Sequence, residues 1–563
     1  MAVYRSDQAQ LTFTTEAVQG GYPELASSVT DDSTAFTAVV NGAITAGATS
    51  FSFDAGTGTP AVGDDIQIGP EVGGSGTYDE SEIRRIVFID SWNSNTGGGG
   101  TATVHLNAPV AFNHLDNAAI TRVTATAATA ADIYIDQIPG VYETVDCPDP
   151  EMAIEPRYFL GTASKRNFFS AYKGQQAYNG SVPGFLLLNG RSLRYPIGSV
   201  TTTPSAYVGS NNVILLNGAT KKGDVFIKYD GANANTMAAD VIVCIDDQDA
   251  TVREVRKVVS VTGGTDAKLD YPLQFAHADN ASIARVAASG ISYTHAIRET
   301  EDLDTVSWHV HLRDSSETAA NDFDRRYFGG MVGSATIAAE EGGMLTMSWD
   351  SVNFLGMVHN QMTSTETGRV IGNNAVSTPF AGLMKTIDND EVDFATTNPY
   401  YFSEGDVQIY GQTIARVRSF SLSIANGEEP RYYIQRRHSG NRGPTEIREN
   451  RREYTCSMTL ALPDSQATTS ATSTLFKELL LEGDYGSGME GFNIVLTFTR
   501  GTDDTITITI PDDGNAETGG NAQGAFIRTA AHDITGDNPI QVDADILFRN
   551  MKIDVVDSLY YYP

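Results

Sequence analysis

Apolar and polar residues alternate over many short stretches of this chain, a pattern typical of β-strands with one buried face. Residues 306–312, 505–510 and 540–548 alternate in this way, and the second stretch ends at Pro511. In the first stretch, Trp308 and its even-numbered neighbours share one face, which predicts a half-buried strand. The 53 glycines also favour many short strands joined by turns over a helical architecture.

A helical pattern stands out at residues 473–482. Leu475, Leu479 and Glu482 lie one turn apart there, and Gly483 supplies a stop. We therefore expect a mostly β fold, a sheet with one packed helix.

An internal repeat joins two distant segments. Residues 106–125 match residues 269–288 at a constant offset of 163, and residues 82–87 resemble residues 254–259 at an offset of 172. The residues of the first segment that recur in the second include Leu106, Pro109, Phe112, His114, Asp116, Asn117, Ala118, Ile120, Arg122 and Val123. So long a match indicates two copies of one small module.

Each module contains short strand-like runs, at 51–53 and 65–68 in the first copy and at 224–227 and 241–243 in the second. Because surface loops tolerate insertions at modest entropic cost, such modules are expected as outward decorations of a longer body. Host-surface contact, carbohydrate binding and shielding in brine are all open as their purpose.

The modules divide the chain into five segments. We predict an N-terminal arm and the start of the body at residues 1–37, module copy 1 at 38–123 and a body segment at 124–205. Module copy 2 follows at 206–288, and the main part of the body at 289–563. A chain of this length exceeds what one hydrophobic core usually serves.

The charged residues of the chain are mostly acidic, which predicts an acidic surface. The chain has 38 basic and 70 acidic residues, a net charge of −32, and ten of the basic residues are lysines. Such a surface suits molar salt, where the Debye length is about 3 Å at 1 M and self-repulsion is screened. We infer a halophilic source; an ordinary acidic surface protein is the alternative. Nucleic-acid binding is not expected, because it needs clustered Lys and Arg.

The three cysteines, Cys147, Cys244 and Cys456, lie too far apart to suggest a disulfide framework or a metal site. The start of the chain lacks a basic and then apolar leader, and no stretch approaches eighteen apolar residues. These features predict neither secretion nor membrane insertion, and they favour assembly in a cytoplasm.

Two histidine pairs are candidate sites. His309 and His311 share a strand face at a spacing that a metal could use, but no third ligand is nearby in sequence. His114 and His277 occupy equivalent places in the two modules, which favours a structural role over catalysis. Neither has a local nucleophile motif.

Other motifs also predict little chemistry. Residues 388–393 have the oxygen density of a calcium loop but lack its glycine and terminal glutamate. The glycine-rich stretches 97–100 and 514–524 lack the lysine of a phosphate-binding loop. We expect no catalytic, cofactor-binding or metal residues and no cofactor, although structural cations are conceivable.

Three segments of the chain have a familiar pattern: the run from Gly161 to Val200, a hairpin that covers 326–337 and 344–349, and the strands at 407–411 and 417–427. They resemble the major tail tube proteins of long-tailed viruses, whose β-sandwich or barrel they would share. The last two strands are similar to the inner sheet of the tube domain. The resemblance covers about two thirds of the chain, which is far longer than a minimal tube subunit.

The resemblance implies a β-sandwich with a packed helix and a structural virion protein, not an enzyme. Copies of the chain would form hexameric rings that stack through a long loop and terminal arms into a tube. The tube would be an acidic conduit for DNA ejection in a siphovirus-like, haloarchaeal tailed virus. Its partners would be the tape measure, tail terminator and baseplate proteins, with DNA passing through without specific binding and no membrane contact.

Other functions remain open at this point. The chain could be a baseplate component, the tube of a contractile tail or an S-layer subunit, and hollow rods would distinguish a tube subunit from these. A β-rich hydrolase is a further alternative. A pair of catalytic carboxylates cannot be chosen from sequence, because acidic residues occur throughout the chain.

Overall fold

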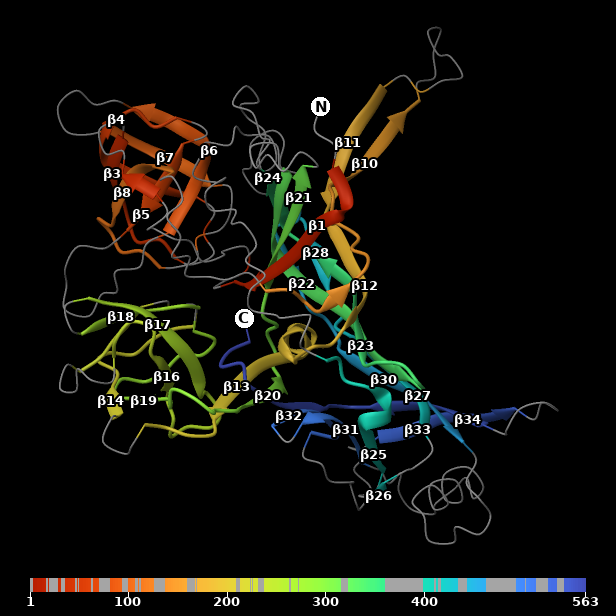
Figure 1. Ribbon diagram of the computed structural model, residues 1–563. Coiled ribbons are helices and arrows are strands. Elements are labelled where there is room, and N and C mark those ends of the chain that lie inside the picture. The colour runs from red at the N-terminus through yellow and green to blue at the C-terminus, as the bar shows by residue number, and fades with distance from the viewer. Residues whose placement is uncertain are drawn as a thin grey trace, which may run out of the picture.

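The computed structural model shows a mostly β protein (Figure 1). It describes residues 4–562 with gaps; the longer gaps are 20–28, 70–81, 94–99, 126–136, 159–167, 231–236, 315–322, 360–397, 434–442, 462–492, 513–524 and 534–540, and the others span at most four residues. The one α-helix of the described chain is the single turn α1 (Arg194–Ile197), which follows the 3-10 turn η2 (Arg191–Leu193). The helix expected at residues 473–482 lies outside the described residues.

The largest sheet has 11 described strands, all antiparallel to their neighbours. Its main path runs β33 (Ala525–Asp533), β34 (Gln541–Phe548), β30 (Glu453–Ala461), β27 (Val417–Ala425), β22 (Phe323–Glu340), β23 (Thr346–Asn353), β12 (Asn179–Leu186) and β9 (Val141–Tyr142). The long strand β22 also pairs with β21 (Val306–Asp314) and β24 (Gly356–His359), and β21 pairs with β1 (Tyr4–Thr15). The hairpin expected at 326–349 is confirmed as β22–β23.

A second sheet of seven described strands faces the first. Its order is β13 (Gly198–Pro204), β20 (Tyr293–Glu299), β35 (Lys552–Asp557), β32 (Asp504–Ile510), β31 (Ile494–Gly501), β25 (Gly405–Ile409) and β26 (Gln412–Thr413). One core cluster contains apolar residues of both sheets, and the rings of Phe420 and Phe498 meet at 5.6 Å across it. The two sheets therefore form a sandwich.

The resemblance to one inner sheet was wrong in one respect. It assigned the strands at 407–411 and 417–427 together, but β25 lies in the second sheet and β27 in the first. Only seven residues separate Ile409 from Val417, and two of them form β26. Strands that are close in sequence can therefore join different sheets, and local sequence does not show which sheet each one joins.

The alternating segments form the predicted strands, with one correction. β21, β32 and β34 cover the three stretches. β21, however, is not half-buried, because Ser307, His309 and His311 on its polar face are buried as well. The strand lies between β1 and β22, and the Glu16 carboxylate accepts a 2.5 Å hydrogen bond from the Ser307 hydroxyl.

A first small barrel, barrel 1, has its own hydrophobic core (Figure 1). It contains β2 (Val29–Asp31), β3 (Phe36–Val40), β4 (Ser50–Gly58), β5 (Asp65–Ile68), β6 (Glu82–Asn93), β7 (Gly100–Leu106) and β8 (Ala119–Ala125). The strands pair in the order β2-β8-β3-β4-β7-β6-β5, and a further pairing of β8 with β5 closes the ring.

A second barrel, barrel 2, repeats this topology. Its strands are β14 (Val213–Leu215), β15 (Phe226–Lys228), β16 (Ile242–Ile245), β17 (Glu254–Thr262), β18 (Asp266–Leu269) and β19 (Ser282–Arg285). They pair in the order β14-β19-β16-β17-β18-β15, and an isolated bridge between Leu216 and Tyr229 closes the ring. Matching strands in chain order, from β3–β8 to β14–β19, preserves every neighbour relation.

The two barrels also repeat their hydrogen bonds. The backbone N–H of Gly42 donates to Asp116 at 2.8 Å in barrel 1, and that of Gly218 donates to Asp279 at 2.7 Å in barrel 2. Both glycines have positive φ, at 82° and 106°, which suits glycine best. The five-segment division of the chain stays a prediction; β3 of barrel 1 begins at Phe36.

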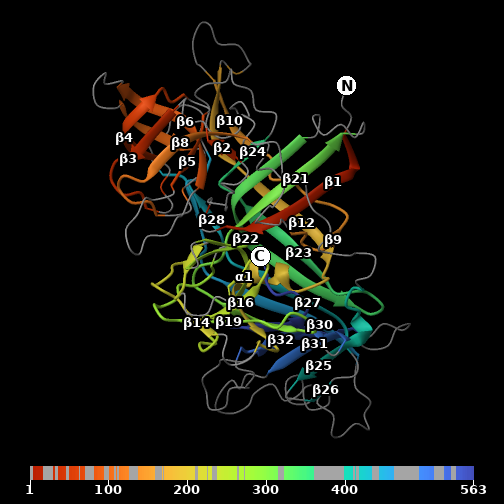
Figure 2. The same ribbon diagram turned by 60° about the vertical axis from the view of Figure 1, so that its left-hand side comes forward.

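A long hairpin of β10 (Glu151–Arg157) and β11 (Ser170–Ala177) projects from the sandwich at the upper right of Figure 1. A short pair, β28 (Glu429–Arg431) and β29 (Glu446–Arg448), lies beside the first sheet. The C-terminus lies between barrel 2 and the sandwich, which is also visible after rotation in Figure 2.

Candidate channel and assembly surfaces

One face of the first sheet carries short hydroxyl side chains, and we call it the hydroxyl face. Its residues stand in register across β23, β22, β27 and β30. One row is Ser348, Thr336, Ser423 and Thr455, and the next is Thr346, Ala338, Ser421 and Ser457. The intervening residues point to the core, as Ile337 and Leu422 do. The alternation of apolar and hydroxyl-bearing residues thus gives the sheet one apolar face and one hydroxyl-bearing face.

The charge of the hydroxyl face is acidic. On β34, Asp545 continues the second row, Leu547 continues the first, and Asp543 stands opposite Thr459. Asp350 lies on β23. The hydroxyls of Thr336 and Thr459 donate to Asp350 and Asp543 at 2.8 Å, and Arg528 pairs with Asp545 at 3.2 Å. The five strands β22, β23, β27, β30 and β34 contain no lysine.

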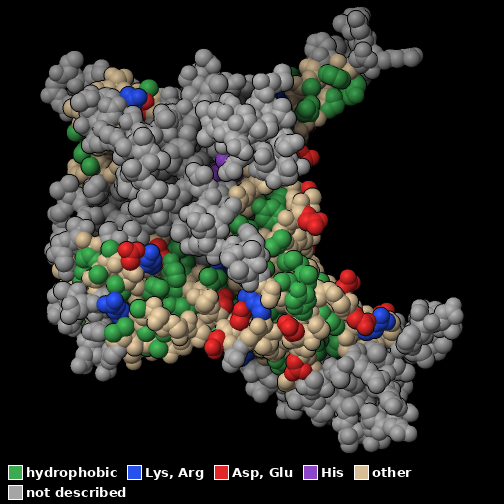
Figure 3. Space-filling model, viewed as in Figure 1, with side chains coloured by type: hydrophobic (Ala, Val, Ile, Leu, Met, Phe, Trp, Pro, Cys, Tyr) green, Lys and Arg blue, Asp and Glu red, His purple; other side chains and the backbone are tan. Residues whose placement is uncertain are grey.

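The β10–β11 hairpin exposes apolar side chains. Ile154 and Tyr172 on its strands are 65% and 51% exposed, and Tyr158 and Phe168 at its ends are 72% and 57% exposed. The guanidinium of Arg157 lies 4.1 Å from the centre of the Tyr172 ring. Figure 3 shows apolar side chains on this projection. A group of large apolar side chains on a projecting element indicates contact with another protein.

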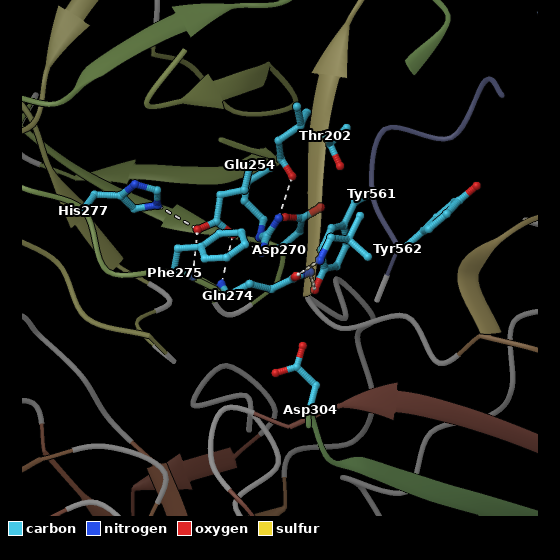
Figure 4. Close-up of polar contacts among 12 residues, drawn as sticks. Thr202, Glu254, Asp270, Gln274, Phe275, His277, Asp304, Tyr561 and Tyr562 are labelled. Carbon is cyan, nitrogen blue, oxygen red and sulfur yellow. Dashed lines mark hydrogen bonds and ion pairs between the residues drawn. The ribbon is translucent and has the colours of Figure 1, made fainter. Parts of the chain in front are cut away.

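Barrel 2 is joined to the sandwich by the C-terminal tyrosines (Figure 4). The Tyr561 ring lies 4.6 Å from the ring of Tyr271 and 3.9 Å from the guanidinium of Arg256. The Tyr560 hydroxyl donates to the carboxylate of Asp270 at 2.5 Å. Burial raises the pKa of Asp270 to about 6, against the opposing effect of the Tyr560 hydrogen bond.

Tyr562 belongs to the sandwich side of this contact. Its ring stacks on His295 at 3.8 Å, and its hydroxyl accepts a 3.2 Å hydrogen bond from the backbone N–H of Gly190. A Cβ on Gly190 would lie 2.6 Å from a Val555 methyl and 3.0 Å from the Tyr562 ring. Glycine at position 190 therefore makes room for the C-terminal segment.

A buried ionic group lies inside barrel 2 (Figure 4). The Glu254 carboxylate accepts hydrogen bonds from Arg256, from His277 Nε2 at 2.7 Å and from the Gln274 backbone at 3.0 Å. Burial alone would raise the pKa of Glu254, but Arg256 and His277 hold it below its usual value. Burial would likewise lower the pKa of His277, but Glu254 and Asp246 raise it. The side chains of this group thus satisfy one another, as buried charges must.

A second ionic contact joins the barrel to the body. The carboxylate of Asp304 pairs with Arg194 and with Lys222 of barrel 2, the latter at 2.7 Å. Burial would raise the pKa of Asp304, but the two cations lower it below its usual value. Asp304 is therefore a charged anchor between η2–α1 and the barrel.

The structure brings the predicted histidines into the interior. His309 and His311 are buried on β21 with their rings 6.4 Å apart. Among the residues that the structure describes, no three His, Cys, Asp or Glu side chains are grouped to hold a metal ion. His114 and His277 are buried in equivalent loops of the two barrels. His114 exchanges backbone hydrogen bonds with Ile44, before β4, and the His277 carbonyl accepts one from the N–H of Thr220, before β15. Their structural role stays a prediction.

Other candidates fall partly outside the described residues. Residues 388–393, 514–524 and 97–99 are among them, and Gly100 is the first residue of β7. Cys147, Cys244 and Cys456 are free thiols, and burial raises the pKa of Cys244 and Cys456 to about 12. The described chain has no helix long and apolar enough to span a membrane.

Comparison with known proteins identifies the chain. The family model described as "Phage tail tube protein" matches residues 98–548. The chain belongs to this family. No curated protein matches it. The family match covers nearly the whole sandwich, all of barrel 2 and the last strands of barrel 1, so this tail tube protein is a structural component of a viral tail that assembles with further copies into a tube. The family is structural and not an enzyme family.

Sequence reasoning missed three features of this tail tube protein. The hydroxyl face was visible as alternating Ser and Thr in 417–425 and 453–461, but one strand does not show which others stand beside it. The residues that join barrel 2 to the C-terminal segment could not be found from sequence, because Asp270, Gln274 and Tyr561 meet only after folding. The match between 40–45 and 216–221, which contains both Asn-Gly turns, was detectable as a repeat at an offset of 176.

Proposed function

We propose that this tail tube protein forms stacked hexameric rings and that the hydroxyl face lines the lumen through which viral DNA is ejected. The observation that carries this proposal is the hydroxyl face itself. It spans adjacent antiparallel strands, bears short side chains and combines Asp350, Asp543 and Asp545 with no lysine on its five strands.

Such a surface suits the passage of DNA. Proteins hold DNA chiefly through Lys and Arg contacts to phosphates, and each such contact would slow sliding. Carboxylates repel the phosphates instead, while short hydroxyl side chains leave the wall smooth. The remaining functions considered for the chain, a baseplate component, an S-layer subunit and a β-rich hydrolase, have no comparable support from the family match.

The apolar hairpin supports a stacking role. A ring that presents Ile154, Tyr158, Phe168 and Tyr172 on a projecting element would bury them against the next ring. The tape measure, tail terminator and baseplate proteins would contact the ends and lumen of the tube in the virion. Assembly would take place in the host cytoplasm.

The charge of the chain favours a haloarchaeal host. A net charge of −32 would cause self-repulsion at low salt, and molar salt would screen it. The virus would then be a long-tailed, siphovirus-like one, although a sheathed contractile tail would use the same kind of tube.

Electron microscopy tests the assembly. The full-length protein in molar sodium or potassium chloride should form hollow rods with six-fold end views in negative stain. Persistent monomers, or rings of another symmetry, would contradict the proposal of hexameric rings.

Cysteine labelling tests the lumen. We expect Ser421→Cys in assembled tubes to react with a small maleimide but to resist a maleimide on a bulky polymer that cannot enter the tube. Thr507→Cys on the polar face of the second sheet is the matched control and should react with both reagents, because this face would point outward. The reverse result would place the second sheet at the lumen.

A further inference from the structure

β13 is an end strand of the second sheet, and such edges are prone to pair with other chains. It pairs with β20 on one side only. On its free side the backbone donors belong to alternate residues, namely Val200 and Thr202, while Pro204 has no N–H. The edge therefore offers two consecutive N–H donors, and a strand from a second copy could accept hydrogen bonds from both.

Barrel 2 occupies both donors. The Val200 N–H donates to the Gln274 side-chain oxygen at 3.3 Å, and the Thr202 N–H donates to the Arg253 carbonyl at 3.1 Å. The Arg253 guanidinium also donates to the Thr203 hydroxyl at 2.9 Å. The barrel thus replaces a neighbouring strand without extending the sheet.

The C-terminal tyrosines hold the barrel in this position. Tyr560 and Tyr561 contact Asp270, Tyr271 and Gln274, which all lie in the loop directly after β18. The same short loop therefore contacts β13 through Gln274 and the C-terminal segment through all three residues.

Barrel 1 lacks the residues that make these contacts. At the repeat offset of 163, the positions of Asp270, Tyr271 and Gln274 are occupied by Asn107, Ala108 and Ala111. Other residues of the repeat, such as the pairs Pro109 and Pro272 or His114 and His277, are identical in both copies. The three differences are thus separable from the barrel fold.

We infer that barrel 2 is an edge cap, latched by the C-terminal tyrosines, that stops β13 from pairing with a strand of a second copy of this chain. The duplicated modules then have different tasks, because barrel 2 is fixed to the sandwich and barrel 1 carries no cap sequence. This inference concerns the single chain and does not depend on the proposed lumen or on ring symmetry.

The test replaces the three contact residues in the loop after β18 of barrel 2 by the residues at the equivalent positions of barrel 1. In the soluble full-length chain, we expect the triple variant Asp270→Asn, Tyr271→Ala, Gln274→Ala to exchange the amide hydrogens of Val200 and Thr202 at least tenfold faster than the unchanged chain. Residues 242–245 in the barrel core should keep their protection. The variant should also self-associate into irregular aggregates in size-exclusion chromatography with light scattering.

The matched control is Leu273→Val, which introduces the barrel 1 residue Val110 in the same loop. Leu273 points into the barrel core, so β13 should stay protected. Unchanged protection of β13 in the monomeric fraction of the triple variant would overturn the inference.

A second variant covers loss of the barrel fold. If residues 242–245 also lose protection in the triple variant, Tyr561→Ala becomes the deciding variant for the edge cap. It removes a tyrosine ring on the C-terminal side of the contact and leaves the sequence of barrel 2 unchanged. Faster exchange at Val200 and Thr202 with a protected barrel core would support the cap, and wild-type protection of β13 would overturn it.

Discussion

Glu428 has a buried carboxyl group, and burial destabilises its ionised form. One of its oxygens accepts hydrogen bonds from Ser351 at 2.9 Å and Asn353 at 2.6 Å, and burial nevertheless raises its pKa to about 7. A carboxyl with a raised pKa in the folded state binds its proton more tightly there than in the unfolded chain. Its contribution to stability is therefore complete below the unfolded pKa near 4.5 and is lost as the pH rises through about 7.

We predict that Glu428→Gln removes this part of the pH dependence. The free energy of unfolding of the unchanged chain should fall, through this group, by on the order of 1–3 kcal/mol between pH 4.5 and 7.5. Denaturant unfolding at both pH values and constant molar salt measures the difference between the two chains. Glu404→Gln, at an exposed position, should keep the full dependence, and an equal slope in Glu428→Gln would contradict the assignment.

Among the described elements, the β10–β11 hairpin exposes several large apolar side chains to solvent. We predict that Ile154→Ser with Tyr172→Ser leaves the subunit folded but shortens or abolishes the tubes, because the apolar contact between rings is lost. Burying two such side chains stabilises an interface by roughly 1.5–3 kcal/mol each. Negative-stain length distributions at equal protein concentration measure the effect.

Leu115→Ser is the control for this element. Leu115 is 49% exposed on barrel 1, so its change should not alter tube length. Tubes of normal length from the hairpin variant would show that the rings stack through another surface.

Barrel 1 can be separated from the rest of the molecule. Val29 and Ala125 pair at the point where the chain enters and leaves it, so a short glycine–serine linker can replace residues 29–125. We predict that this deletion still gives hollow rods. Failure of the deleted chain to form tubes would show that barrel 1 takes part in assembly and is not an outward decoration.

Removal of barrel 2 should behave differently. Residues 213–285 can be excised in the same way, because Val213 and Ala284 pair, but the deletion exposes the β13 edge. We predict irregular aggregates from this chain under conditions where the deletion of barrel 1 gives rods. Regular rods from both deletions would argue against the edge cap.

The whole molecule should depend on salt. With a net charge of −32, self-repulsion opposes folding until the Debye length shrinks from about 10 Å at 0.1 M to about 3 Å at 1 M. We predict that the midpoint of urea unfolding rises steeply over this range and then levels off. Sucrose at equal osmolality is the uncharged control, and equal stabilisation by sucrose would contradict an electrostatic cause.

The sequence alone determined the strand content, the module repeat and the acidic surface. Alternation at 306–312 and 505–510 predicts strands because side chains of an extended chain point to opposite faces. The repeat at 106–125 and 269–288 predicts one fold in two places, and both barrels have the same strand order. These properties are local or compositional, so no knowledge of tertiary contacts was needed.

Only the tertiary structure decided which strands share a sheet and what covers their edges. Ser421 and Ser457 become one surface because β27 and β30 pair, and β25 lies in the other sheet although it is nearer to β27 in sequence. The contact of Tyr561 with Tyr271 joins residues 290 positions apart. Such contacts follow from the packing of whole elements, which local periodicity does not encode.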